Sequence, residues 1–331
     1  MPCYNASATL DLAIESILGQ SLVDFEAIVV DDGSDDETHA LLQKWAWRDA
    51  RIRVLAQSHA GIVQALNLGL GYCQADYVAR MDADDVSLSE RLDLQANFLD
   101  ENPSIDLVSC QVRGFPSDQV REGFLVYLEW LNGLISDDDI RREIFVESPL
   151  PHPSVMFRKH KVLTVGAYQE HTWAEDYDLW LRMYLAGSRF AKIPQVLVEW
   201  REHEERLTRT DSRYSLENFL RAKAFYLVRG PLLNRDAVIV WGAGMMGRRL
   251  TRQLRKQNAP VKAFVDIDPR KIGRTKLSLE VIAPHNLMAC WKRYNRPVIL
   301  ACVGARGARH LIRQELQRLG FQEGQDWWGA A

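Results

Sequence analysis

The chain has 331 residues, 47% of them hydrophobic and 26% charged, and a net charge of −3. Its length suggests about two domains, and the mixture is typical of a globular protein, which excludes a fibre or a disordered chain. We expect no transmembrane segment and no secretion signal, because no apolar run approaches the ~20 residues that cross a bilayer. Five scattered cysteines without metal-type spacing predict buried thiols in a reducing compartment, and hence a cytoplasmic protein.

The net charge conceals two blocks of opposite sign. Residues 1–230 hold 23 Lys and Arg against 37 Asp and Glu, whereas residues 231–331 hold 18 against 7. We therefore expect two domains that have different ligands or that dock on one another. Because an acidic block binds nucleic acid poorly, nucleic acid is excluded as a partner, and a phosphorylated substrate would require a metal cation.

Strand-like and helix-like segments alternate through residues 1–110. Short apolar runs predict strands at 25–30, 52–56, 77–81 and 105–110. Apolar residues three or four positions apart predict helices over 10–18 and 62–70, and one helix after each of two predicted capping residues, Ser34 and Ser89. This alternation implies an α/β fold with a mostly parallel sheet and helices on both faces, whose ligands bind outside the carboxyl ends of the strands.

An acidic segment, Asp82–Asp85, directly follows one predicted strand. Three carboxylates within four residues repel one another unless a cation lies among them. Oxygen ligands of this kind suit Mg²⁺ or Mn²⁺, which commonly bridge a protein carboxylate and a substrate diphosphate. The alternative is a solvated acidic turn before the next helix.

Two further acidic segments have both a structural and a functional interpretation. In Asp31–Ser34, one aspartate is expected to accept a hydrogen bond from a base or ribose, unless the segment serves only as a turn and helix cap. Glu175 and Asp176 fall in the first turn of a predicted helix. There they either interact favourably with the helix dipole or supply a general base for an attacking hydroxyl.

Taken together, these segments resemble the family-2 glycosyltransferases, which have a GT-A-type fold. The resemblance covers roughly residues 1–210, and we set the domain at 1–212. It rests on motifs in a fixed order: Pro2–Ala6, Val29–Thr38, the small residues Gly61, Ala65, Asn67 and Gly69, then Arg80–Asp85, and finally Glu175 with Asp176. Members normally carry a hydrophobic strand before the first motif, so we expect the true start to lie upstream of Met1.

The resemblance implies inverting transfer of a sugar from a nucleotide-diphosphate sugar to an acceptor hydroxyl, dependent on Mg²⁺ or Mn²⁺. It implies Asp176 as the general base, with Glu175 beside it. The donor nucleotide is expected at Pro2, Tyr4, Asn5, Asp31, Asp32 and Asp82, with Asp32 on the base and Asp82 on the ribose or metal; metal ligands are expected among Asp84, Asp85 and His203. The resemblance also implies a glycan or lipid-linked acceptor in surface-glycan or polysaccharide assembly, with peripheral contact at the inner face of the membrane.

A helical linker is predicted over 213–234, followed by a second α/β domain over 235–331. A strand at 238–241 leads into a glycine-rich turn, and a second strand at 261–265 ends at an acid. This pattern is the dinucleotide fingerprint and resembles a small Rossmann-like domain. The second nucleotide site, for NAD(P), would comprise Gly242, Gly244, Gly247 and Asp266. The alternative is that these glycines serve close helix packing without a ligand.

Two other functions are compatible with the sequence. The C-terminal half could make the protein an NAD-dependent oxidoreductase acting on a nucleotide sugar, which predicts a cofactor-dependent absorbance change. The chain could also be a non-catalytic nucleotide-sugar-binding subunit, in which replacement of Asp176 would have no consequence for turnover.

Overall fold

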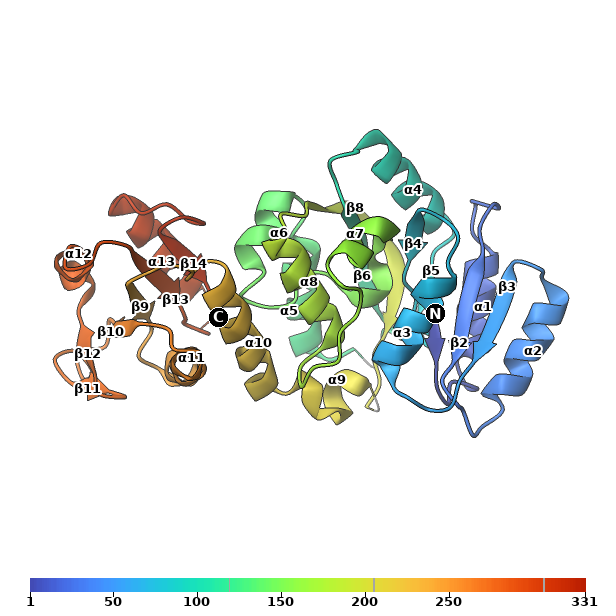
Figure 1. Ribbon diagram of the computed structural model, residues 1–331, viewed down its shortest axis with the longest axis horizontal. Helices are drawn as coiled ribbons and strands as arrows, with labels where there is room; N and C mark the ends of the chain where they lie inside the picture. Colours follow the sequence, from blue (N-terminus) through green and yellow to red (C-terminus); the bar gives the residue numbers. More distant parts are fainter. Residues whose placement is uncertain (119, 205, 306) are drawn as a thin grey trace. The chain divides into compact units, whose positions relative to one another are not determined.

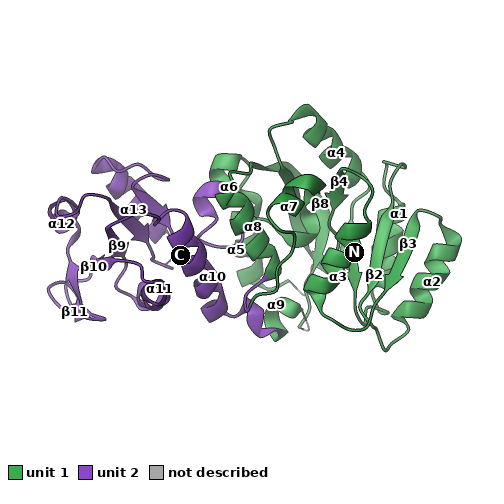
Figure 2. Cartoon of the chain, in the orientation of Figure 1, with its two compact units in different colours: residues 1–140, 149–171, 175–210 green, residues 141–148, 172–174, 211–331 purple. Residues whose placement is uncertain are grey.

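The structure, a computed structural model, describes residues 1–118, 120–204, 206–305 and 307–331 (Figure 1). These residues form two compact units (Figure 2). Unit 1 comprises residues 1–140, 149–171 and 175–210, and unit 2 comprises residues 141–148, 172–174 and 211–331. Unit 2 therefore includes two short segments from the first part of the sequence. It also includes the region that the sequence analysis treats as a linker.

Unit 1 consists of short strands alternating with helices. Its strands are β1 (Pro2–Cys3), β2 (Ala27–Asp31), β3 (Ile52–Ala56), β4 (Tyr77–Ala79), β5 (Val86–Ser87), β6 (Leu107–Phe115), β7 (Met156–Arg158) and β8 (Phe190–Arg201). Its helices are α1 (Leu10–Leu18), α2 (Thr38–Arg48), α3 (Ile62–Tyr72), α4 (Arg91–Glu101), α5 (Glu122–Asn132), α7 (Lys159–Thr164), α8 (Glu175–Leu185) and α9 (Leu207–Thr210), while α6 (Asp137–Glu143) runs from unit 1 into unit 2.

The strands of unit 1 form two sheets, and the prediction of one mostly parallel sheet is wrong for the second. In the described residues, β1, β2 and β3 form a parallel sheet. The other sheet has the order β4-β7-β6-β8-β5, in which only β6 and β8 pair in parallel. Alternation of strands and helices identifies the elements, but it does not determine the direction in which strands far apart in sequence pair.

Helices cover both faces of the parallel sheet of unit 1. Side chains alternate along β2, so that Val29 packs with Leu10 and Leu42, whereas Ile28 and Val30 pack with Ala65 of α3. The first of these clusters also contains Ala83 from the acidic segment. Thr9 Oγ1 donates a 3.0 Å hydrogen bond to the carbonyl oxygen of Ala83. The acidic segment is thus fixed against the start of α1.

The two predicted capping serines are wrong. Helix α2 begins after Glu37 and α4 after Glu90, and neither residue provides a side-chain cap. Ser34 instead accepts a hydrogen bond from the backbone N–H of Asn5. Asp36 accepts one from the N–H of Thr38, which satisfies one of the exposed donors at the start of α2.

Unit 2 contains the second predicted α/β region. Its strands are β9 (Ala237–Trp241), β10 (Val261–Val265), β11 (Thr275–Lys276), β12 (Leu279–Ile282), β13 (Pro297–Ala301) and β14 (Trp327–Gly329). Its helices are α10 (Leu216–Arg229), α11 (Met245–Lys256), α12 (Leu287–Trp291) and α13 (Ala308–Arg318). The sheet has the order β11-β12-β10-β9-β13-β14, and its strands pair in parallel except at β11.

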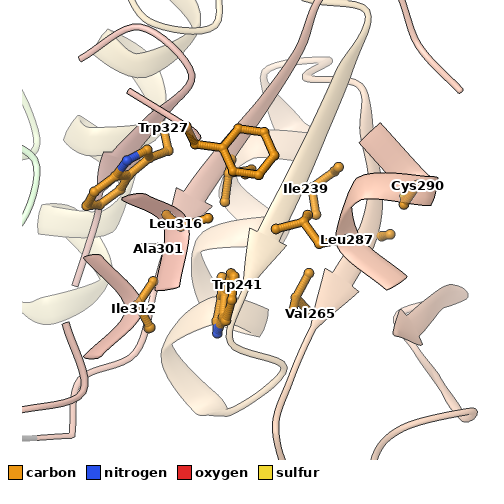
Figure 3. Close-up of a cluster of buried hydrophobic side chains, with 12 residues drawn as sticks. Ile239, Trp241, Val265, Leu287, Cys290, Ala301, Ile312, Leu316 and Trp327 are labelled. Carbon is orange, nitrogen blue, oxygen red and sulfur yellow. The ribbon is translucent and has the colours of Figure 1, made fainter. Parts of the chain in front are cut away.

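One face of this sheet is packed with large apolar side chains (Figure 3). Ile239 and Trp241 of β9 lie in one buried cluster with Leu287 of α12, Leu316 of α13 and Trp327 of β14. All five residues of β9 are apolar and buried, and β10 is apolar except at the exposed Lys262, which is why the sequence predicts both strands.

All five cysteines are free; Cys3, Cys110, Cys290 and Cys302 are buried as predicted, whereas Cys73 is partly exposed. Among the described residues, no helix has both the length and the apolar character that a membrane crossing requires.

Candidate active site

The acidic segment connects β4 to β5 and places three carboxylates together. One carboxylate oxygen from each of Asp82, Asp84 and Asp85 lies within 4.8 Å of the others. Burial raises the pKa of Asp84, and the neighbouring Asp82 carboxylate raises it further. Burial, then Asp84, then Asp82 raise the pKa of Asp85 well above its usual range. A cation at this position would relieve the repulsion, so the donor set fits a hard divalent ion.

Asp84 and Asp85 have different surroundings. Asp85 is 1% exposed; its Oδ1 accepts a 2.7 Å hydrogen bond from the N–H of Arg201, and its Oδ2 has no hydrogen-bond partner among the described residues. Asp84 lies 3.0 Å from His203, measured from Oδ2 to Nε2, and both side chains are 34% exposed. Asp85 therefore holds the segment against the end of β8, while Asp84 and His203 are accessible to a ligand.

The predicted catalytic pair begins α8. Asp176 is half-buried, and its Oδ1 accepts a 2.6 Å hydrogen bond from the N–H of Tyr177. Burial and then the adjacent Glu175 raise the pKa of Asp176 to about 7. The Asp82 carboxylate raises this pKa as well, whereas the Arg80 guanidinium lowers it. Asp176 therefore lies within electrostatic reach of the acidic segment, as a shared site requires.

Arg80 interacts electrostatically with both Asp82 and Asp176, although the sequence predicts no separate role for it. Its side chain is 5% exposed and forms an ion pair with Asp82. Its Nε has no hydrogen-bond partner among the described residues. Arg91 Nη2 donates a 2.7 Å hydrogen bond to the Arg80 carbonyl oxygen, which fixes the backbone at this point. An arginine in the apolar strand immediately before three carboxylates is the signal that could have identified it.

Behind Arg80 lies a buried polar pair, His152 and Tyr168. His152 Nε2 lies 2.8 Å from the Tyr168 hydroxyl oxygen, and both side chains are buried. Burial, together with the Arg80 cation, holds the pKa of His152 well below its usual range. His152 is therefore neutral and supports the wall of the site without adding positive charge.

The other predicted nucleotide residues lie around the β1–β2 edge. The exposed Tyr4 ring stacks on His59, with ring centroids 4.1 Å apart. Asn5 has a φ of 49° and accepts a 3.0 Å hydrogen bond from the N–H of Asp35. Pro2 lies in β1 and pairs with Val30 of β2.

Asp31 and Asp32 are both 3% exposed, and their carboxylates interact with other residues of this chain. Asp31 accepts from the N–H of Ser34 and lies 2.8 Å from Nδ1 of His39. Asp32 accepts hydrogen bonds from Gln57 Nε2 and from the backbone N–H groups of Ala60 and Gly61. These contacts order the loop that presents Tyr4 and His59. Neither Gln57 nor His59 carries a motif signal in the sequence.

Close packing explains why glycine stands at most positions of the glycine-rich turn of unit 2. Gly242 has a φ of +121°, and a Cβ there would lie 2.5 Å from the Cys302 carbonyl oxygen. A Cβ at Gly247 would lie 1.8 Å from the Gly242 carbonyl oxygen. A Cβ at Gly244 would meet no described atom within 4 Å. Two of the three glycines are therefore required by the fold itself.

Asp266 follows β10 as predicted, but its carboxylate is already occupied. It accepts a 2.9 Å hydrogen bond from the N–H of Ala243 and lies 3.0 Å from Nζ of Lys271. It also accepts a hydrogen bond from the N–H of Asp268. These three contacts tie the end of β10 to the glycine-rich turn.

Comparisons with known proteins agree on the first part of the chain. Residues 1–163 match the family described as Glycosyl transferase family 2. The chain is 31% identical over 236 residues to the amylovoran biosynthesis glycosyltransferase AmsE of Erwinia amylovora, which covers 66% of this chain and 86% of that protein. It is 28% identical over 220 residues to the UDP-Gal:alpha-D-GlcNAc-diphosphoundecaprenol beta-1,3-galactosyltransferase of Escherichia coli, which covers 66% of this chain and 78% of that protein.

Much of the chain has solved counterparts in fold. The structure of S. aureus TarS 1-349 in complex with UDP aligns with a TM-score of 0.54 and 20% sequence identity. The alignment covers 70% of this chain and 65% of TarS, so the chain spans just under two thirds of that structure. At this level of identity the likeness concerns the fold alone.

Proposed function

Because this chain belongs to glycosyl transferase family 2, we propose that it is a metal-dependent inverting glycosyltransferase. It moves a sugar from a nucleotide-diphosphate sugar to an acceptor hydroxyl. The observation that carries this proposal is the cluster of Asp82, Asp84 and Asp85 within electrostatic reach of Asp176. A cluster of carboxylates can bind the cation that stabilises the leaving diphosphate. A carboxylate of raised pKa can accept the proton of the acceptor hydroxyl.

Asp84 and His203 would hold the Mg²⁺ or Mn²⁺, with Asp82 beside them. When bound, the ion neutralises negative charge on the leaving diphosphate. Asp85 acts differently in this proposal, since its contact with the Arg201 N–H keeps the segment in place. The accessible stack of Tyr4 on His59 offers an aromatic face to the nucleotide base.

Asp176 acts as the general base. As the acceptor oxygen forms its bond to the anomeric carbon, the bond from that carbon to the diphosphate breaks, and the acceptor proton passes to Asp176. A single base suffices for inversion, so no enzyme nucleophile is required. The raised pKa of Asp176, about 7, makes its carboxylate a stronger base than an exposed aspartate while leaving a large fraction ionised near neutral pH.

For the acceptor we propose a glycan or a lipid-linked sugar in polysaccharide assembly, because the relatives named above act in amylovoran biosynthesis or on a diphosphoundecaprenol acceptor. We propose accordingly that the protein acts in the cytoplasm, in peripheral contact with the inner face of the membrane. Unit 2 we regard as Rossmann-like in its strand, glycine turn and helix. The occupied carboxylate of Asp266 gives no support to NAD(P) or to redox chemistry there.

The test is transfer by the purified full chain. UDP-galactose and UDP-GlcNAc are each supplied with Mn²⁺ and N-acetylglucosaminyl diphosphoundecaprenol, and UDP release and product mass are measured. We expect turnover with one donor that stops on addition of EDTA. Turnover that survives EDTA would contradict the metal assignment. Donor binding with no turnover in wild type and Asp176→Asn alike would instead favour a non-catalytic binding subunit.

A further inference from the structure

Asn67 of α3 belongs to the small-residue motif, and its side chain holds the backbone of a residue 101 positions later in the sequence. Nδ2 of Asn67 donates a 2.8 Å hydrogen bond to the Tyr168 carbonyl oxygen, and Oδ1 accepts a 3.0 Å hydrogen bond from the Tyr168 N–H. An amide that satisfies both backbone groups of one residue fixes that residue much as a neighbouring strand would. Both residues belong to unit 1 (Figure 2).

Helix α3 gives Asn67 a firm support within unit 1. The helix packs on the parallel sheet through Ala65, which lies in a buried cluster with Ile28 and Val30 of β2. A Cβ at Gly69 would lie 3.3 Å from Val30 Cγ2, so helix and sheet are in close contact there. The helix therefore cannot shift without disturbing a packed core.

The side chain of Tyr168 extends this connection to the helix of the proposed base. Its hydroxyl oxygen lies 2.8 Å from His152 Nε2. The His152 ring stands edge-on to the ring of Trp180, with centroids 5.8 Å apart and planes at 81°, a favourable arrangement for two rings. Trp180 is fully buried on α8, four positions after Asp176, so the two side chains lie on the same face of that helix.

The loop over residues 165–171 is also bound to α8 directly. Arg182 of α8 donates a 2.7 Å hydrogen bond from Nη1 to the Val165 carbonyl oxygen. At the other end of the loop, His171 Nε2 lies 3.5 Å from Asp178 Oδ1. Both ends of the loop are thus attached to α8 and its middle to α3, by contacts that all lie within unit 1.

The Tyr168 hydroxyl lies within electrostatic reach of the proposed base. Burial raises the pKa of Tyr168, the Arg80 cation lowers it, and the carboxylates of Glu175 and Asp176 raise it. A shift of Tyr168 would therefore change the surroundings of Asp176 as well as its support.

We propose that Asn67 is a positioning residue for the general base, acting on Asp176 through Tyr168, His152 and the part of α8 that they contact. This inference rests on the proposed function of Asp176. A base displaced by about 1 Å can lose roughly 100-fold in turnover, so loosening this connection should affect the chemical step more than donor binding. The asparagine of the small-residue motif thereby has an indirect role in catalysis.

The test compares Asn67→Ala with Asn132→Ala in the full chain. Asn132 ends α5 and holds Val112 of β6 in the same way: its Nδ2 donates a 2.8 Å hydrogen bond to the Val112 carbonyl oxygen, and its Oδ1 accepts a 2.9 Å hydrogen bond from the Val112 N–H. Each change removes two hydrogen bonds to the backbone of unit 1, but β6 carries no residue of the proposed site.

Turnover is measured with UDP-galactose or UDP-GlcNAc, Mn²⁺ and N-acetylglucosaminyl diphosphoundecaprenol. We expect Asn67→Ala to lower kcat about tenfold or more, with KM for the donor within about twofold, while Asn132→Ala keeps the wild-type kcat. Unchanged kcat in Asn67→Ala, or an equal loss in both variants, would overturn the proposal. If Asn67→Ala does not fold, Asn67→Asp, which keeps Oδ1 as an acceptor, takes its place with the same expected split between kcat and KM.

A double variant tests the route through Tyr168. Tyr168→Phe keeps the ring but removes the hydroxyl that contacts His152, and we expect it to lower kcat several-fold. Combined with Asn67→Ala, it should give the kcat of Asn67→Ala alone, because both changes break the same connection. Losses that multiply in the double variant would contradict this route.

Hydrogen exchange provides a measurement that needs no turnover. Amide exchange over residues 176–182 should be faster in Asn67→Ala and should keep the wild-type rate in Asn132→Ala. Unchanged exchange in Asn67→Ala would overturn the positioning role even if the wild type is active. If the wild type turns over neither donor but exchange changes as expected, the proposed function fails while the positioning of α8 by Asn67 stands.

Discussion

The acidic segment of unit 1 and the end of β10 in unit 2 each place aspartate after a strand, in opposite electrostatic conditions. Asp84 and Asp85 lie near one another with raised pKa values, Asp85 buried and Asp84 34% exposed, and Asp85 Oδ2 has no hydrogen-bond partner among the described residues. Asp266 has Lys271 and two backbone N–H groups around its carboxylate. We therefore propose that the first arrangement takes up a cation, whereas the carboxylate of Asp266 is already compensated by groups of the chain itself. The comparison suggests that uncompensated charge is a better guide to a ligand site than a motif.

We expect the largest loss of kcat when the proposed general base, Asp176, is replaced. Asp176→Asn keeps the shape of the side chain but removes its capacity to accept a proton, so kcat should fall by about 1,000-fold. Binding of UDP with Mn²⁺, measured by calorimetry, should stay within about threefold of wild type, because Asp176 does not contact the nucleotide in our proposal. A variant with normal kcat would remove Asp176 from the mechanism.

The next effect contrasts the two carboxylates directly. Asp84→Asn should lower kcat/KM by roughly 100-fold at a fixed Mn²⁺ concentration. In metal-free protein it should not lower the unfolding temperature, since it removes a repelled charge. Asp266→Asn should affect stability and not activity. It should lower the free energy of unfolding by ~1–3 kcal/mol, while transfer continues. If both variants behave alike in unfolding and turnover assays, the distinction between the two regions fails.

Glycines of unit 2 provide a third comparison. Gly247→Ala places a Cβ against the Gly242 carbonyl oxygen and should lower the free energy of unfolding by ~1–3 kcal/mol. Gly244→Ala has open space for its Cβ and should change that free energy by less than ~0.5 kcal/mol. Urea titrations of both variants measure this. Loss of transfer in Gly244→Ala with intact stability would point to a ligand at the turn after all.

The smallest effect is on pH dependence. Asp176 must be deprotonated to act as a base, and its pKa is about 7, so kcat should fall as the pH drops below this value. Arg80 lowers that pKa, so Arg80→Gln should move the acidic limb of the profile to higher pH, whereas Arg80→Lys should hold it nearer to wild type. A profile with the same acidic limb in all three proteins would contradict the electrostatic role of Arg80.

Local patterns in the sequence predict much of this structure. The predicted strands at 52–56 and 261–265 coincide with β3 and β10, each of which is apolar at every position except its second. The acidic segment is also predictable, since its residues are neighbours in the sequence. That this segment lies near Asp176 depends on the fold and cannot be predicted from neighbouring residues. The expectation came from the resemblance to a known family.

Other features depend on contacts that no local pattern contains. The antiparallel pairing of β4 with β7 joins residues about eighty positions apart. The capture of Asp32 by the N–H groups of Ala60 and Gly61 depends on where a later loop passes. The assignment of residues 172–174 to unit 2 depends on side chains of α10. Each of these is a long-range choice that becomes visible only in three dimensions.

The anchoring of residues 141–148 in unit 2 has a consequence for biosynthesis. Glu143 pairs with Arg309 and Arg313 of α13, and a Cβ on Gly329 would lie 3.0 Å from Val146 Cγ2. A ribosome delivers Val146 long before it delivers these partners. The nascent chain therefore cannot complete the contacts of residues 141–148 until β14 has left the exit tunnel. A polypeptide released before that point would carry this segment without its partners.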